Sequence, residues 1–179
     1  LENSIIESIH HNTVTVIKAS SGQGKTTLAL QAAYILQQEY KTYQLLWCDD
    51  VKEIGNIIKY FKMRIEMGEK ILILLDNLDN HLGKWNELAQ LLQSELQQHY
   101  KLLITTREID WYNYCGDLSN VQSVKIIKPI LDKKEAIEIF NLFRDAKQLH
   151  PDITSWEKAW NKIADQQLLI EYVYLLTHG

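Results

Sequence analysis

Short apolar runs alternate with amphipathic segments along most of the chain. The apolar runs are rich in aliphatic and β-branched residues, and they predict strands at 13–18, 43–48, 70–76, 101–106 and 122–127. Between them, apolar residues recur at helical spacing over 27–38, 51–67 and 85–99. Strands that alternate with helices in this way predict an α/β fold with a parallel sheet. The runs 43–48 and 70–76 are almost entirely apolar, as in strands covered on both faces, and 70–76 is expected in the centre of the sheet.

Downstream of the last predicted strand, the pattern changes to helices alone. Asp132 and Glu135 form a capping-box pair that predicts a helix ending near residue 147. Thr154 and Glu157 form a second such pair and open another helix. Residues 168–177 predict a third. A small helical subdomain is therefore expected at this end of the chain.

Two segments are less regular. Residues 1–10 fit a short helix or a linker that lies over a bound nucleotide, and a segment that only packs against the core fits them equally well. Residues 108–117 are rich in aromatic side chains without a clear period, so they are expected to be irregular.

The whole pattern predicts an α/β domain over 1–129 and a helical subdomain over 130–179. Because the chain begins without Met, it is expected to be a piece of a longer protein.

Composition restricts the class of protein further. The chain has 179 residues, 46% hydrophobic and 23% charged, which is typical of one globular domain with a small appendage. A net charge of −4 argues against electrostatic nucleic-acid binding. Cys48 and Cys115 lie in or beside apolar stretches, as expected for reduced thiols in the cytoplasm. The longest aliphatic run, 71–75, is too short to span a membrane.

The stretch 14–28, VTVIKASSGQGKTTL, joins the first predicted strand to the first predicted helix. It matches the phosphate-loop pattern G-x-x-x-x-G-K-[ST], except that Ala19 stands at the first position. Gly22 and Gly24 let backbone N–H groups curl around anionic oxygens, and Lys25 can reach the β- and γ-phosphates. The alternative is a chance G-K-T at the start of a helix, which the strand-turn-helix context disfavours.

Two carboxylates follow the third predicted strand. Asp76 ends the run, where the carboxyl edge of a parallel sheet faces the ligand crevice, and it can hold Mg²⁺ together with the hydroxyl of Thr26. Asp79 comes three residues later and can orient or deprotonate the water that attacks a γ-phosphate. The alternatives are a solvated turn residue for Asp76 and a helix cap for Asp79.

The fourth predicted strand ends in Thr105, Thr106 and Arg107. Polar groups at the tip of a buried strand are placed to meet the γ-phosphate, and arginine forms bidentate contacts with phosphate. Arg107 is therefore predicted to sense the nucleotide. The alternative is an arginine that caps the strand end and pairs with Glu108 or Asp110.

Four motifs in order, ASSGQGKTTLA, ILILLDNLD, KLLITTR and IKPILDKKEAIEIF, resemble the signal-transduction ATPases with numerous domains (STAND), the group of the NB-ARC, NACHT and AP-ATPase modules. The resemblance implies a P-loop NTPase three-layer fold with a five-stranded parallel sheet and a small helical subdomain. The TTR strand would lie between the phosphate-loop strand and the Asp76 strand. The candidate residues are Ser20, Ser21, Gly22, Gln23, Gly24, Lys25, Thr26, Thr27 and Arg107 for the nucleotide, Thr26 and Asp76 for Mg²⁺, and Asp79 and Arg107 for catalysis.

The sequence also departs from the family pattern. Asn77 stands where NB-ARC members have a second acid, and Asn80 replaces a Glu of the NACHT pattern, which implies weak turnover. The Gly-Leu-Pro-Leu segment that contacts adenine in the family has no clear counterpart, and residues 166–170 stand at its place without a proline.

The resemblance implies an ATP/ADP-binding switch in which nucleotide exchange controls self-association and signalling, with defence as one setting, and with slow Mg²⁺-dependent hydrolysis. One alternative is a self-sufficient P-loop ATPase or a kinase, although a kinase lid would be richer in arginine than 132–179. A domain that has lost nucleotide binding is disfavoured because Lys25, Thr26 and Asp76 are all present. No membrane partner is expected, and nucleic acid is disfavoured.

Overall fold

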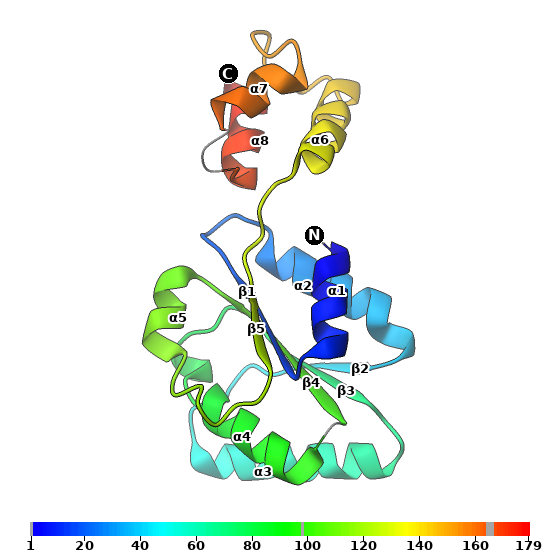
Figure 1. Ribbon diagram of the computed structural model, residues 1–179, viewed down its shortest axis with the longest axis vertical. Coiled ribbons are helices and arrows are strands. Elements are labelled where there is room, and N and C mark those ends of the chain that lie inside the picture. The colour runs from blue at the N-terminus through cyan, green and yellow to red at the C-terminus, as the bar shows by residue number, and fades with distance from the viewer. Residues whose placement is uncertain (1, 98, 164–166) are drawn as a thin grey trace. The chain divides into compact units, whose positions relative to one another are not determined.

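The computed structural model describes residues 2–97, 99–163 and 167–179 (Figure 1). Its sheet consists of β1 (Val14–Lys18), β2 (Lys41–Gln44), β3 (Ile71–Leu75), β4 (Tyr100–Thr106) and β5 (Val124–Ile127). The strands are parallel and lie in the order β2-β3-β4-β1-β5. The strand that ends in TTR therefore lies between β1 and β3, and the predicted α/β fold with a five-stranded parallel sheet is confirmed.

Helices connect these strands and cover both faces of the sheet (Figure 1). They are α1 (Glu2–His11), α2 (Lys25–Ile35), α3 (Val51–Glu66), α4 (Trp85–Leu96) and α5 (Glu108–Tyr114), with the short 3-10 helices η1 (Leu36–Gln38) and η2 (Asn80–Leu82). The open question about residues 1–10 is answered by α1, a helix whose Ile5 and Ile9 are buried. Because every strand runs in the same direction, the carboxyl ends of the strands gather at one edge, where the candidate site residues follow.

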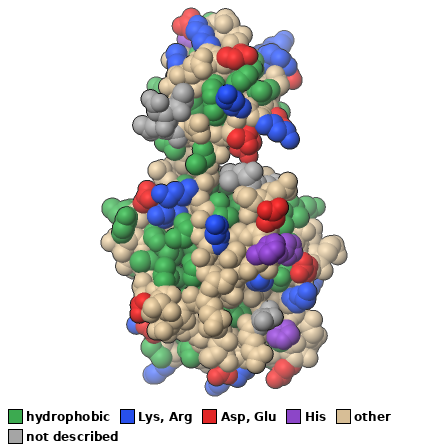
Figure 2. Space-filling view, in the orientation of Figure 1, with side chains coloured by type: hydrophobic (Ala, Val, Ile, Leu, Met, Phe, Trp, Pro, Cys, Tyr) green, Lys and Arg blue, Asp and Glu red, His purple; other side chains and the backbone are tan. Residues whose placement is uncertain are grey.

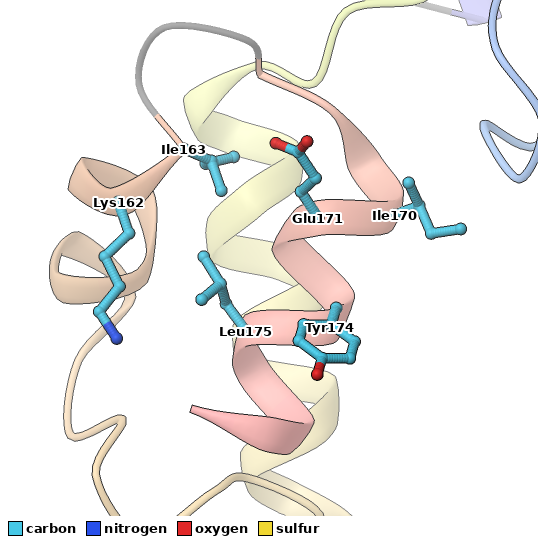
Figure 3. Close-up of a pocket in the computed structure, with 6 residues that line it drawn as sticks. All are labelled: Lys162, Ile163, Ile170, Glu171, Tyr174 and Leu175. Atoms are coloured by element: carbon cyan, nitrogen blue, oxygen red, sulfur yellow. The ribbon is translucent and has the colours of Figure 1, made fainter.

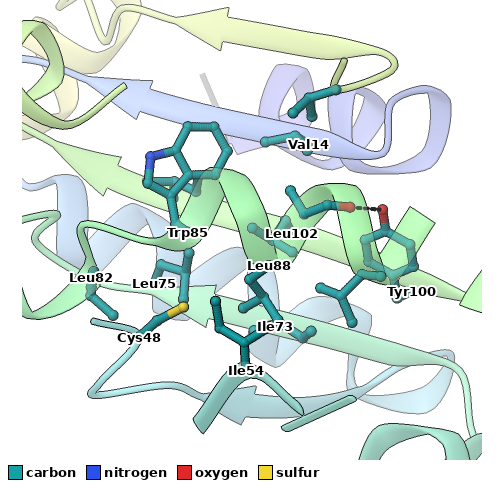
Figure 4. Close-up of a cluster of buried hydrophobic side chains, with 14 of the residues drawn as sticks. Val14, Cys48, Ile54, Ile73, Leu75, Leu82, Trp85, Leu88, Tyr100 and Leu102 are labelled. Carbon is teal, nitrogen blue, oxygen red and sulfur yellow. Dashed lines mark hydrogen bonds between the residues drawn. The ribbon is translucent and has the colours of Figure 1, made fainter. Parts of the chain in front are cut away.

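Alternate residues of the inner strands point to opposite faces of the sheet. In β3, Ile71, Ile73 and Leu75 belong to one buried cluster, whereas Leu72 and Leu74 belong to another. The first cluster joins the sheet to α3 and α4, as Figure 4 shows, and the second joins it to α1 and α2. Burial on both faces explains the uninterrupted apolar run of this strand.

The second strand lies earlier in the chain than the sequence predicted. The prediction of 43–48 is wrong in position, because β2 ends at Gln44 and lies at the edge of the sheet beside β3. Leu46 and Trp47 are 56% and 55% exposed in the connection to α3, whereas Cys48 is buried. The apolar run therefore belongs mostly to a loop that places one side chain in the core, and not to a strand covered on both faces.

Residues 108–114 form α5, where irregular structure was predicted. Glu108 and Asp110 lie in its first turn, where negative charge interacts favourably with the helix dipole. Trp111 is buried, and its ring centroid lies 5.7 Å from that of Trp85 in α4. The Trp85 indole Nε1 donates a hydrogen bond of 2.7 Å to the carbonyl of Tyr114. Tertiary packing thus stabilises α5, which is too short for its apolar residues to show helical spacing in the sequence.

The C-terminal part consists of α6 (Lys133–Asp145), α7 (Trp156–Lys162) and α8 (Leu169–His178). The predicted capping box at the start of α6 is confirmed, since Asp132 accepts from the backbone of Glu135 and the Glu135 side chain accepts from the backbone of Asp132. The second predicted box is wrong, because Ser155 and not Thr154 is the N-cap of α7. Ser155 accepts from Lys158 N, and a lysine at that position cannot complete a capping box. These helices share one core.

By its contacts, the chain divides into two compact units. One comprises Leu1–Ser21 and Lys25–Lys128, and the other comprises Gly22–Gly24 and Pro129–Gly179. No helix in the described part of the chain is long and apolar enough to cross a membrane.

Candidate nucleotide-binding site

The loop after β1 has the geometry that the phosphate-loop motif requires. Gly22 and Gly24 have φ values of 74° and 70°, in the left-handed region that favours glycine. Ala19 N donates to the carbonyl of Thr106 at 3.2 Å, so the loop begins beside the end of β4. α2 then begins at Lys25, and its unpaired N-terminal amides and positive dipole end favour an anion there.

Lys25 lies at the start of α2 with its ammonium within the loop. Its Nζ donates to the carbonyl of Ser20 at 2.9 Å. The pKa of Lys25 is lowered, first by burial and second by the positive charge of Arg107, while the charges of Asp76 and Asp110 act in the opposite direction. An anion beside Lys25 would oppose this lowering, because it stabilises the charged form.

Asp76 joins the phosphate loop to β4 through two hydroxyl groups. The Oγ1 atoms of Thr26 and Thr105 donate to Asp76 Oδ1 at 2.9 and 2.5 Å. Thr105 Oγ1 also accepts from Asn77 N at 2.7 Å. The sequence pointed to the polar tip of this strand as a whole, whereas the structure singles out Thr105. Leu75 pairs with Ile104, so the next residues, Asp76 and Thr105, lie side by side; this register cannot be read from either segment alone.

The acids and amides after Asp76 have structural roles in this arrangement. Asp79 is the N-cap of η2, and its Oδ1 accepts from His81 N at 2.8 Å. The cap that was the alternative interpretation of Asp79 is therefore present, and its catalytic role remains a prediction. Asn77, which stands where NB-ARC members have an acid, has a φ of 60°. Asn tolerates this left-handed conformation better than most residues.

Arg107 follows β4 and stands at the N-cap position of α5, where its side chain makes no capping hydrogen bond. Its Nε and Nη2 donate to the two carboxylate oxygens of Asp110 at 2.5 and 3.2 Å. The pairing with Asp110 that was the alternative interpretation of Arg107 is thus present. The guanidinium also affects the pKa of Lys25, so it lies within electrostatic reach of the phosphate loop.

Gln23 is the buried member of the loop, at 3% exposed, whereas Ser20, Ser21 and Thr27 are exposed. Within the second unit, Gln23 Oε1 accepts from Leu169 N at 2.9 Å. Its Nε2 is buried and has no hydrogen-bond partner among the described residues. A buried donor left unpaired costs about 1–3 kcal/mol.

The donor set also fits Mg²⁺. Thr26 and Asp76 present neighbouring oxygen atoms, which are the ligands that this ion takes. The described residues contain no cluster of three or more His, Cys, Asp or Glu side chains suited to a metal. A metal at Thr26 and Asp76 would therefore take its remaining ligands from phosphate oxygens and water.

A separate cavity lies in the second unit, between α7 and α8 (Figure 3). It has a volume of about 420 Å³ and is lined by Lys162, Ile163, Ile170, Glu171, Tyr174 and Leu175. None of the predicted phosphate or metal residues lines it. Of the segment compared above with Gly-Leu-Pro-Leu, Ile170 lines this cavity, while its first residue, 166, lies outside the described residues.

Charges on the visible surface are mixed. On the face in Figure 2, Lys and Arg side chains lie among Asp and Glu side chains and do not form one continuous basic patch.

Comparison with known proteins gives one family. The model of the family described as Novel STAND NTPase 5 matches residues 1–119. No curated protein sequence matches the chain.

Two solved structures share the fold. One is a Signal Transduction ATPase with Numerous Domains protein with a tetratricopeptide repeat sensor from Pyrococcus horikoshii, with a TM-score of 0.58 and 18% identity over 96% of this chain. This chain covers 28% of that protein. The other is a chain of the HORMA:CdnC:Trip13 complex of E. coli MS115-1, with a TM-score of 0.51 and 12% identity over 94% of this chain and 73% of that one.

Proposed function

Because this chain belongs to the Novel STAND NTPase 5 family and is a nucleotide-binding module, we propose that it is the ATP/ADP-binding switch of a larger STAND protein. The observation that carries the proposal is the hydrogen-bonded set of Thr26, Asp76 and Thr105 beside a glycine loop and Lys25. These groups lie at the carboxyl edge of the sheet, which is where ligands of open α/β sheets bind.

Each residue has a role in this proposal. The loop amides and Lys25 hold the β- and γ-phosphates, and Thr26 and Asp76 hold Mg²⁺. The bound ion neutralises charge on the phosphates. Thr105 fixes the orientation of the Asp76 carboxylate, and Arg107 distinguishes a nucleotide with a γ-phosphate from one without it.

Hydrolysis is proposed to be slow. The carboxylate of Asp79 already accepts a hydrogen bond as a helix cap, and amides stand at the two neighbouring positions, Asn77 and Asn80. A carboxylate engaged as a helix cap is a poor general base and amides cannot act as one, so fast turnover is not expected from these three residues. Slow hydrolysis suits a switch, because the ATP state then lasts long enough to be read by a partner.

Exchange of ADP for ATP is proposed to control self-association and signalling in the whole protein, with defence as one setting. The support is family membership and the sensor described for the related Pyrococcus protein. The cytoplasm is the proposed location, since Cys48 and Cys115 are both free thiols.

Replacing Lys25 by Ala tests nucleotide binding directly. Binding of a fluorescent ADP analogue should be lost, because the Lys25 ammonium lies at the loop, where it donates to the carbonyl of Ser20. Lys41→Ala, an exposed lysine at the opposite end of the sheet, is the matched control and should bind as the parent does. Equal affinity of the Lys25→Ala variant and the parent would remove the phosphate-loop assignment.

A further inference from the structure

Arg107 and Asp110 form a bidentate ion pair at the start of α5. Nε and Nη2 of the guanidinium donate to the two oxygens of one carboxylate, so this edge of the arginine is fixed in position and in plane. We propose that Asp110 is the positioning residue that makes the site selective for ATP over ADP, by holding Arg107 with its other edge free for the γ-phosphate. This inference rests on the nucleotide-binding function proposed above.

The free edge follows from the number of donors. A guanidinium has five N–H groups, and the pair with Asp110 uses two of them. The Arg107 side chain is 49% exposed, whereas that of Asp110 is 11% exposed. The carboxylate is therefore enclosed, while much of the guanidinium remains open to a ligand.

The pair is close to the phosphate loop. Thr106, directly before Arg107, pairs with Lys18 at the end of β1, and its carbonyl accepts from Ala19 N. The charges of both Arg107 and Asp110 influence the pKa of Lys25. Arg107 therefore follows a strand end that adjoins the start of the phosphate loop, and an arginine already fixed by Asp110 loses little conformational entropy on binding a phosphate.

Asp110 is held by a rigid element. The next residue, Trp111, is 6% exposed and packs against Trp85 of α4, and the Trp85 indole is hydrogen-bonded to the carbonyl at the end of α5. The middle and the carboxyl end of this helix are therefore attached to the core. A charged group on a packed helix holds its partner more accurately than one on a loop.

The neighbouring acid provides a matched control. Glu108 lies in the same turn of α5, but its carboxylate pairs with Lys18 and Lys128. Glu108→Gln therefore makes the same change of charge in the same helix without touching the Arg107 pair.

The experiment compares the dissociation constants of a non-hydrolysable ATP analogue and of ADP for the purified protein. Asp110→Asn is expected to weaken binding of the ATP analogue about tenfold, which corresponds to the loss of one charge-assisted hydrogen bond. The dissociation constant of ADP should change less than twofold. Asp110→Glu should recover part of the loss because it restores a carboxylate. Glu108→Gln should leave both constants unchanged. Arg107→Lys keeps the charge but lacks the planar fork, so it should lose the same selectivity.

A double variant separates positioning from a general structural effect. If Asp110 acts through Arg107, Asp110→Asn should have no further effect on ATP in the Arg107→Ala background. An equal loss for ATP and ADP, a gain in ATP affinity, or a full further loss in that background would overturn the proposal. A parent protein that binds neither nucleotide would instead refute the proposed function.

Discussion

Substituting Thr105 by Val keeps the shape of a fully buried side chain and removes the hydroxyl that joins Asp76 to the backbone of Asn77. The lost bond to the carboxylate is charge-assisted, which corresponds to about 1.5–3 kcal/mol. The amide of Asn77 also loses its acceptor, but it lies at an exposed residue where water can replace the hydroxyl. We therefore expect the free energy of unfolding to fall by about 1.5–3 kcal/mol.

The same substitution should weaken Mg²⁺-dependent binding more than binding without the metal. Asp76 would keep only the hydrogen bond from Thr26, so its carboxylate would be less well oriented as a ligand. Titration with a fluorescent ADP analogue in Mg²⁺ should show about a tenfold loss of affinity, in the range found when a group that orients a metal ligand is removed. In EDTA, the variant and the parent should be within twofold of each other.

Thr15→Val is the matched control for this experiment. Thr15 is also fully buried, in the neighbouring strand β1, and its hydroxyl bonds to Ser8 at 2.9 Å, an interaction between two neutral groups. Urea unfolding should show a loss of about 1 kcal/mol for this control and no change in nucleotide affinity. A Thr105→Val variant that is no less stable than Thr15→Val, or that responds to Mg²⁺ as Thr15→Val does, would contradict this role of Thr105.

Three further predictions concern the proposed site. In the protein without nucleotide, the pKa of Lys25 lies below its usual 10.5, and a bound phosphate should raise this pKa. Nucleotide binding at alkaline pH should therefore take up a proton. Affinity measured against pH should be constant near neutrality and decline before pH 10.5, and a flat profile up to that pH would contradict this. Asp76→Asn should weaken Mg²⁺-dependent binding, while Asp79→Asn should leave binding intact and slow hydrolysis; parental turnover in the Asp79 variant would make that residue a cap only. The purified chain should hydrolyse ATP far more slowly than about one per second, and saturating nucleotide at ~100 times Kd should add about 2.7 kcal/mol of stability. Turnover of tens per second would favour a self-sufficient ATPase.

The sequence predicted the order of elements because the inner strands are buried on both faces. The run 71–75 could hardly be anything but an inner strand, and the capping box at Asp132 marked the start of α6 to the residue. Assigning strands from apolar runs failed at the edge of the sheet, where Leu46 and Trp47 are apolar but exposed. It also failed for α5, whose helical state depends on the contact between Trp111 and Trp85.

The candidate site could be predicted in part. The loop and Asp76 follow from local motifs, because their residues are consecutive or end a strand. The roles of Thr105 and Asp110 depend on strand register and on which side chain an arginine meets in space. Such pairings between distant segments leave no mark in a local pattern. The presence of Asn77 in place of the second acid of NB-ARC members has a physical reason, because the backbone at this position is left-handed, a conformation that Asn tolerates.

The strand order has a consequence for how the protein folds. β1 carries the phosphate loop, yet its neighbours in the sheet are β4 and β5, the last two strands to be synthesised. A nascent chain therefore keeps Val14 and Val16 without strand partners until residues 100–106 have left the ribosome. Contacts of such long sequence separation slow folding, and the loop has no support at its base before they form. Nucleotide in the cell is then expected to slow the unfolding of the finished domain and to have little effect on the rate at which it folds.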